Sequence, residues 1–79
     1  MKMKNKPRVV KFPENKDIAR KLRAGDRVII ARYAGLQPGT IRDMMSGFRR
    51  ITDPVARAII RLMNERQELD RALDEIANQ

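Results

Sequence analysis

Residues 31–47 have the sequence ARYAGLQPGTIRDMMSG, in which a glycine interrupts an otherwise helical pattern. Apolar residues precede Gly35, and the apolar period resumes soon after Pro38 and Gly39. Glycine adopts a positive φ at low cost, and proline suits the first turn of a helix because no amide donor is needed there. We therefore predict two short helices, joined by a turn at Gly35 and crossing at a steep angle.

The apolar positions around Gly35 follow the spacing of a helix-turn-helix. A small residue lies four positions before the glycine, where it lets two helices approach closely. Apolar residues also lie five before, one before, one after, six after and nine after it. The six positions hold Ala31, Ile30, Ala34, Leu36, Ile41 and Met44. This match favours a helix-turn-helix over a helical corner that serves packing only.

The segment before this pair has helical signals of its own. Asn15 is the expected N-cap of a first helix over 15–24, and Gly25 follows its end. Asp26 is expected to cap the second helix, which ends at Gly35. The buried side of this second helix is expected to hold Val28, Ile29, Ile30, Ala31 and Ala34.

The third and fourth helices complete the pattern. The third is predicted over 38–46 and ends before Gly47. An Asp-Pro pair at 53–54 is a strong start signal for a helix over 54–77, and no glycine or proline follows Pro54 in that range. At 1.5 Å per residue, a fourth helix over that range is about 36 Å long.

The predicted fold class is all-α, a small helical bundle with a helix-turn-helix and a long C-terminal helix. One short N-terminal strand can form at 8–12, RVVKF, because the segment contains β-branched residues. A lone strand needs a partner strand, which another subunit can supply. We expect a basic N-terminal arm at 1–14, the helix-turn-helix domain at 15–64 and a C-terminal helical extension at 65–79.

Charge favours a nucleic-acid partner. The 79-residue chain has 18 Lys and Arg against 10 Asp and Glu, which gives a formal net charge of +8. Residues 1–27 carry a net charge of +7, residues 28–53 carry +2 and residues 54–79 carry −1. Such a concentrated basic region is typical of proteins that bind polyanions, although many small domains are basic for solubility alone.

Cysteine and histidine are both absent from the chain. Their absence removes the commonest general base, the thiol nucleophile and the usual ligands of transition metals. The Asp and Glu side chains of the C-terminal part lie along a solvated helix face and do not form the carboxylate pair that acid–base catalysis needs. We therefore expect no enzyme, no metal and no cofactor. No apolar run is long enough to span a membrane, and a cytoplasmic location is expected.

Residues 18–63 resemble the lambda-repressor-like helix-turn-helix DNA-binding domains, of the Cro and repressor type. The resemblance rests on the spacing around Gly35 and on SGFRRITDPVARAI, residues 46–59. The second stretch is similar to the family's loop and following helix, where a small polar residue and a glycine end the recognition helix and basic residues follow. The resemblance implies that the helix at 38–46 lies in the major groove of duplex DNA.

In the family's arrangement, the first turn and the outward face of the recognition helix meet base edges. The side chains expected there are Gln37, Thr40, Arg42, Asp43 and Ser46. Glutamine can pair with adenine and arginine with guanine. Asp43 can accept from a cytosine amino group or pair locally with Arg42. Pro38 and Gly39 depart from the family's pattern because they offer no polar side chain, so fewer direct base contacts are expected.

Phosphate contacts are expected from residues beside the recognition helix. The candidates are Arg27, Arg32, Gly39, Arg49 and Arg50. Arg27 lies at the start of the second helix, and Gly39 lets the backbone come close to a phosphate. The basic arm can follow the DNA backbone or enter a minor groove, or can serve solubility alone. Its candidate residues are Lys2, Lys4, Lys6 and Arg8.

The fourth helix carries a heptad seam, in which apolar residues recur at alternating steps of four and three with one defect, Arg66. Its positions are Val55, Ile59, Leu62, Arg66, Leu69, Leu73 and Ile76. The first three can pack on the domain's own core, whereas the last three lie beyond the reach of so small a bundle. We expect a homodimer interface at Leu69, Ala72, Leu73 and Ile76, with Arg66 facing an acidic group of the partner. The alternative is that this segment folds back on the first helix or on the N-terminal segment.

These features predict a sequence-specific regulator of transcription, a repressor that binds double-stranded DNA as a homodimer and associates with the nucleoid. Its two half-sites are expected about 34 Å apart, one turn of DNA. The alternative function is a protein-interaction module or antitoxin-like adaptor that binds a partner protein through its C-terminal helix. RNA is a third candidate ligand.

Overall fold

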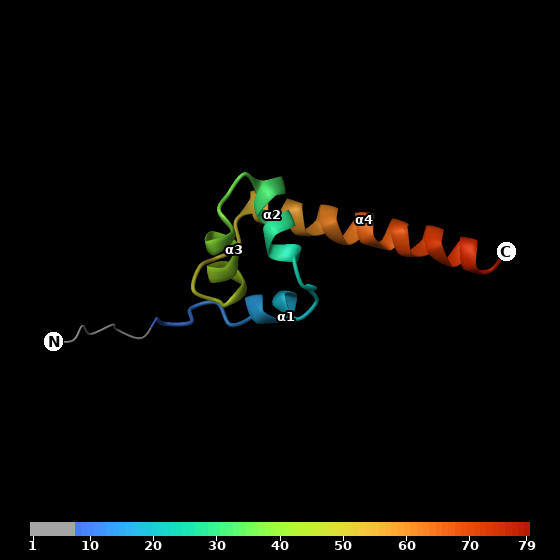
Figure 1. Ribbon diagram of the computed structural model, residues 1–79. Helices are drawn as coiled ribbons and strands as arrows, with labels where there is room; N and C mark the ends of the chain where they lie inside the picture. The colour runs from blue at the N-terminus through green and yellow to red at the C-terminus, as the bar shows by residue number, and fades with distance from the viewer. Residues whose placement is uncertain (1–7) are drawn as a thin grey trace.

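A computed structural model describes residues 8–79 as four helices, with no strand in that range (Figure 1). The helices are α1 (Asn15–Ala19), α2 (Asp26–Ala34), α3 (Pro38–Met45) and α4 (Asp53–Ala77). The all-α class is confirmed, and the strand expected at 8–12 is wrong. None of the described helices is both long and apolar enough to cross a lipid bilayer.

The core lies where α2 and α3 pack against the first half of α4. Its buried side chains are Ile30, Ala31, Ile41, Met44, Met45, Val55, Ala58, Ile59 and Leu62. The spacing around Gly35 therefore predicts four core residues correctly, while Ala34 is half-buried. Leu36 is exposed because it lies in the turn, outside both helices. Val28, expected on the buried side of α2, is also exposed because it is about 200° around the helix from Ile30.

The turn between α2 and α3 has the expected geometry. Gly35 has a φ of 71° and follows the last residue of α2. The amide of Leu36 donates to the carbonyl of Ala31 at 2.9 Å, which satisfies the end of the helix. Gln37 is extended and Pro38 begins α3, so the turn between the two helices has three residues, 35–37. The predicted helix pair is confirmed, and α3 ends at Met45, one residue earlier than expected.

The first helix differs from the prediction, because α1 ends at Ala19 and does not reach residue 24. The amides of Lys21 and Leu22 bond three residues back, so the chain tightens and leaves the helix there. Asn15 is not the N-cap, since Glu14 occupies that position. The buried Asn15 amide group instead donates to the carbonyl oxygens of Met44, at 3.0 Å, and Arg49, at 2.9 Å.

The segment 8–12 packs on the turn that follows α3. The amides of Lys11 and Phe12 both donate to the carbonyl oxygen of Gly47 at 3.0 Å. Gly47 is buried and has a φ of 87°. The segment uses its backbone donors on this turn and not on a neighbouring strand, which is why the expected strand does not form.

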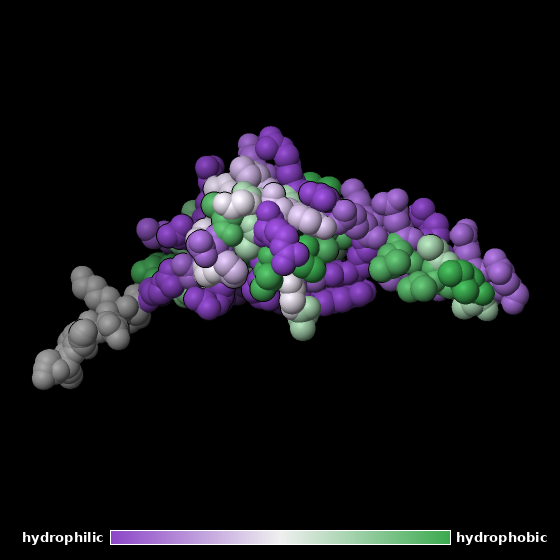
Figure 2. All heavy atoms as spheres, turned by 45° about the horizontal axis from the view of Figure 1, so that its top comes forward, coloured by the Kyte–Doolittle hydropathy of each residue, from purple (hydrophilic) through white to green (hydrophobic). Residues whose placement is uncertain are grey.

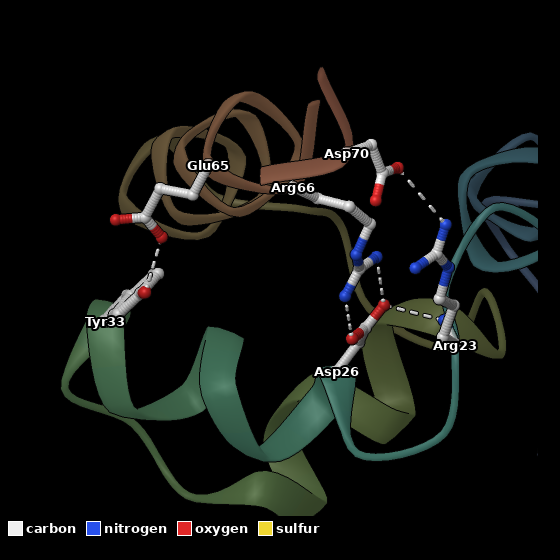
Figure 3. Close-up of polar contacts among 6 residues, drawn as sticks. All are labelled: Arg23, Asp26, Tyr33, Glu65, Arg66 and Asp70. Carbon is white, nitrogen blue, oxygen red and sulfur yellow. Dashed lines mark hydrogen bonds and ion pairs between the residues drawn. The ribbon is translucent and has the colours of Figure 1, made fainter. Parts of the chain in front are cut away.

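A buried ion pair joins α2 to α4 (Figure 3). Arg66 donates to the two carboxylate oxygens of Asp26 at 2.8 and 2.5 Å, and the Arg23 amide donates to one of them at 2.6 Å. The Asp26 side chain is only 2% exposed. Asp26 therefore does not cap α2 with its side chain. Arg66, expected to face a partner's acid, is satisfied within its own chain.

Three further contacts hold α4 where it leaves the domain, and Figure 3 shows two of them, Tyr33 with Glu65 and Arg23 with Asp70. The Tyr33 hydroxyl donates to Glu65 at 2.6 Å, and the Arg61 guanidinium lies 3.7 Å from the centre of the Tyr33 ring. Arg23 lies 3.9 Å from a carboxylate oxygen of Asp70. Beyond this point α4 continues as a single helix away from the domain (Figure 1). The expectation that it folds back on α1 or on the N-terminal segment is wrong for the described residues.

We predict that Gly47→Ala lowers the free energy of unfolding by about 1–3 kcal/mol. An added Cβ would lie 2.9 Å from the Phe12 carbonyl oxygen and 2.9 Å from Val10 Cγ1, at a φ that alanine rarely adopts. Gly39→Ala is the matched control, because its Cβ meets nothing closer than Arg42 at 3.6 Å. It should raise stability by up to about 1 kcal/mol. Urea unfolding followed by circular dichroism measures both, and equal effects would contradict the packing at Gly47.

A second prediction concerns the pH dependence of stability. The Arg66 hydrogen bonds hold the pKa of Asp26 below its usual value. The unfolded chain therefore takes up the Asp26 proton first as the pH falls below about 4, and the free energy of unfolding decreases there. Asp26→Asn should lower stability at neutral pH and flatten this acid limb. The free energy of unfolding of both proteins is measured from pH 2 to 7. If it falls equally in the two proteins as the pH is lowered, the pair contributes nothing to the acid dependence of stability.

Candidate nucleic-acid interface

The outer side of α3 is polar and faces away from the core. Ile41, Met44 and Met45 are buried on the inner side. Helix geometry places Arg42, Asp43 and Ser46 on the opposite side, together with Gly39. Gln37 and Arg42 are exposed, and the side chains of the remaining candidates, Thr40, Asp43 and Ser46, are half-buried. The residues expected to meet base edges thus share one accessible surface around α3.

Gly39 leaves the backbone of the first turn of α3 open. The nearest atom to an added Cβ is a terminal nitrogen of Arg42 at 3.6 Å, an ordinary van der Waals distance. Gly39 also has a helical φ, so neither its conformation nor its packing requires glycine. A glycine within a helix costs about 0.5–1 kcal/mol relative to alanine. The fold alone therefore gives no reason for this residue, whereas close approach of a ligand would.

Asp43, the only acidic residue of α3, is held by arginines from two other segments. Arg8 donates to it at 3.0 Å, and Nε of Arg49 lies 3.9 Å from its second oxygen. The guanidinium of Arg8 also lies 4.2 Å from the centre of the Phe48 ring. The Arg8 hydrogen bond holds the pKa of Asp43 below its usual value. The local pairing expected with Arg42 is wrong, since the carboxylate turns to the N-terminal segment.

The remaining basic candidates lie on α2 and in the loop after α3. Arg49 and Arg50 are exposed in the loop after α3, Arg32 is exposed on α2, and Arg27 is half-buried in the first turn of α2. Arg8 is anchored on α3 and is not a free member of the arm. The other arm candidates, Lys2, Lys4 and Lys6, lie outside the described residues.

The anchoring of α3 at its end was missed by sequence reasoning. Arg8, Asn15 and the backbone amides of Lys11 and Phe12 all hold this end from a distant segment. Lys11 belongs with the basic candidates, because its backbone is fixed beside Gly47 and its side chain is exposed. The glycine that follows α3 was the available signal, because a buried glycine marks a place where another backbone approaches closely.

The C-terminal half of α4 carries an exposed apolar face. Figure 2 shows hydrophobic atoms gathered along one side of this part of the helix. Leu69, Leu73 and Ile76 are 61%, 55% and 65% exposed. The first part of the heptad seam, up to Leu62, is buried against the domain as expected. The seam therefore changes from core to open surface at Arg66.

Comparisons of the chain with models of protein families, with curated proteins and with solved structures find no match.

The titration of Asp43 provides a third prediction. Because Arg8 donates to its carboxylate, Asp43 should titrate below the usual pH range of an aspartate. Arg8→Ala removes this hydrogen bond, so the midpoint should move upward. Carboxyl chemical shifts followed by NMR over pH 2–6 measure the midpoint, and Arg42→Ala serves as a control that removes a nearby charge without removing the bond. An unchanged midpoint in Arg8→Ala would contradict the contact.

Proposed function

We propose that this protein is a sequence-specific DNA-binding regulator of transcription, acting as a repressor, with α3 in the major groove of duplex DNA. The observation that carries the proposal is the accessible polar side of α3 beyond a tight glycine turn. A major groove about 12 Å wide admits one helix, and arginine and glutamine are suited to its base edges. Arg42 and Gln37 are the principal candidates for base contacts, with Thr40 and Ser46 beside them.

The glycine in the first turn of α3 supports this role. Neither φ nor packing demands glycine at position 39, although glycine makes the helix less stable there than alanine would. A ligand that comes close to the backbone explains why the residue is glycine. A phosphate fits this place, because the free amides of a helix N-terminus bind anions. Gly39 is therefore proposed as a backbone phosphate contact, together with the side chains of Arg27, Arg32, Arg49 and Arg50.

The Arg8–Asp43 pair also fits a polyanion partner. An uncompensated carboxylate on the recognition helix would repel DNA phosphates, and here two arginines offset its charge. The pair fixes Arg8 against α3, beside the proposed interface. Asp43 is thereby reassigned, as part of the proposal, from a base contact to an anchor for the N-terminal segment.

We propose further that the protein acts as a homodimer in the cytoplasm, associated with the nucleoid. Leu69, Ala72, Leu73 and Ile76 form the proposed interface, because three large apolar side chains are unfavourable in water. The same exposed face favours the second candidate function, an adaptor whose tail binds a different protein. A stable monomer in sedimentation would favour that candidate.

The fourth prediction tests DNA binding directly. Selection from a random duplex library should return a nearly palindromic site, and Arg42→Ala should weaken binding to that site by about 1–3 kcal/mol. Gly39→Ala should also weaken binding although it does not harm the fold. Arg71→Ala is the matched control, because it removes the same charge from an exposed position far along α4. Fluorescence anisotropy over a salt series measures all four proteins.

The outcomes separate the candidates. No binding to any duplex at low salt would overturn the proposal, because phosphate contacts should give a steep salt dependence. Equal losses in Arg42→Ala and Arg71→Ala would show attraction to overall charge only. Preference for RNA over duplex DNA in direct competition would favour the third candidate ligand.

A further inference from the structure

We propose that, in the dimer, the tail of each chain docks in a groove between α1 and α4 of the other chain, and not against the other tail. The tail is residues 67–79, and the groove is lined by Asp17, Ile18, Lys21, Ile59 and Met63. The inference deepens the proposed dimer by naming both surfaces of its interface. It does not depend on DNA binding.

The groove and the tail are both apolar surfaces left open by the single chain. Ile18 of α1 is 37% exposed although it lies beside Ile59 and Met63 of α4. The tail exposes Leu69, Leu73 and Ile76 to a greater extent. Because α4 is one unbroken helix through Ala77, the tail cannot turn back into its own groove. The tail that fills the groove must therefore come from a second copy of the chain.

The two surfaces follow one another along α4. Ile59 belongs both to the heptad seam and to the lining of the groove, and Met63 lies one helical turn further along. Arg66, paired with Asp26, marks the boundary between the groove end and the tail end. If the α4 helices of two chains lie antiparallel, the tail of the second chain lies at the groove of the first chain. The tail of the first chain then lies at the groove of the second. Two-fold symmetry makes the exchange reciprocal.

Charge decides between this arrangement and a pairing of tail with tail. The tail has four acidic side chains and one basic, a net charge of −3. Residues 16–23, which include most of α1 and the turn after it, have four basic side chains and one acidic, a net charge of +3. Tail against tail places like charges together, whereas tail against α1 places opposite charges together. Within one chain, the approach of Arg23 to Asp70 at 3.9 Å already shows this attraction.

Cross-linking of introduced cysteines tests the arrangement, since the natural chain has no cysteine. Lys21→Cys and Leu73→Cys proteins are unfolded together, refolded without DNA and treated with a short bismaleimide. The expected product is the mixed dimer, in which Lys21→Cys of one chain is linked to Leu73→Cys of the other. Arg71→Cys lies on the far side of the tail, so using it in place of Leu73→Cys should abolish this product. Efficient linking of Leu73→Cys to itself without a mixed product would overturn the inference, as would a monomer in sedimentation.

Salt provides a second measurement on the unmodified protein. Opposite charges across the interface predict that the dimer dissociates more readily as sodium chloride is raised, because screening weakens the attraction. Dimer formation that strengthens with salt would indicate tail-to-tail pairing and overturn the inference. If the mixed cross-link forms but the protein does not bind duplex DNA, this interface is supported and only the proposed function is wrong.

Discussion

Asp26 lies at the first residue of α2 and is almost completely buried, so its carboxylate must find a positively charged partner. Arg66 supplies it from the middle of α4 with two short hydrogen bonds. This pair fixes the angle at which α2 crosses α4, and α2 in turn carries α3 through the three-residue turn after Ala34. The direction in which α3 faces therefore depends on a charge pair between α2 and α4.

The end of α3 is held in a comparable way by groups from the N-terminal segment. Asn15 bonds to two carbonyls around the end of the helix, and the Gly47 carbonyl accepts from two amides of residues 11 and 12. Arg8 adds a charged contact with Asp43. A helix of eight residues is too short to be stable by itself, so these contacts supply the rigidity that a binding surface needs.

The helix pair and the long final helix could be predicted from the sequence because their signals are local. Gly35, Pro38 and the apolar spacing act within a few residues of one another, and 54–77 has no residue that breaks a helix. The role of Asn15 and the partner of Arg66 could not be predicted in this way. Their contacts join residues 29 to 40 positions apart, and neither periodicity nor a capping signal carries such information.

Within residues 8–79, the side chains of Gln37 and Arg42 form no ion pair with the rest of the protein, and both are exposed. Substitutions at these two positions should therefore not disturb folding, and under the proposed function a few of them would be enough to change the target sequence. Asp43 does not share that freedom, because replacing it also releases Arg8. Under the proposed function, new specificity should accordingly evolve through positions 37 and 42 while the residue at 43 stays the same.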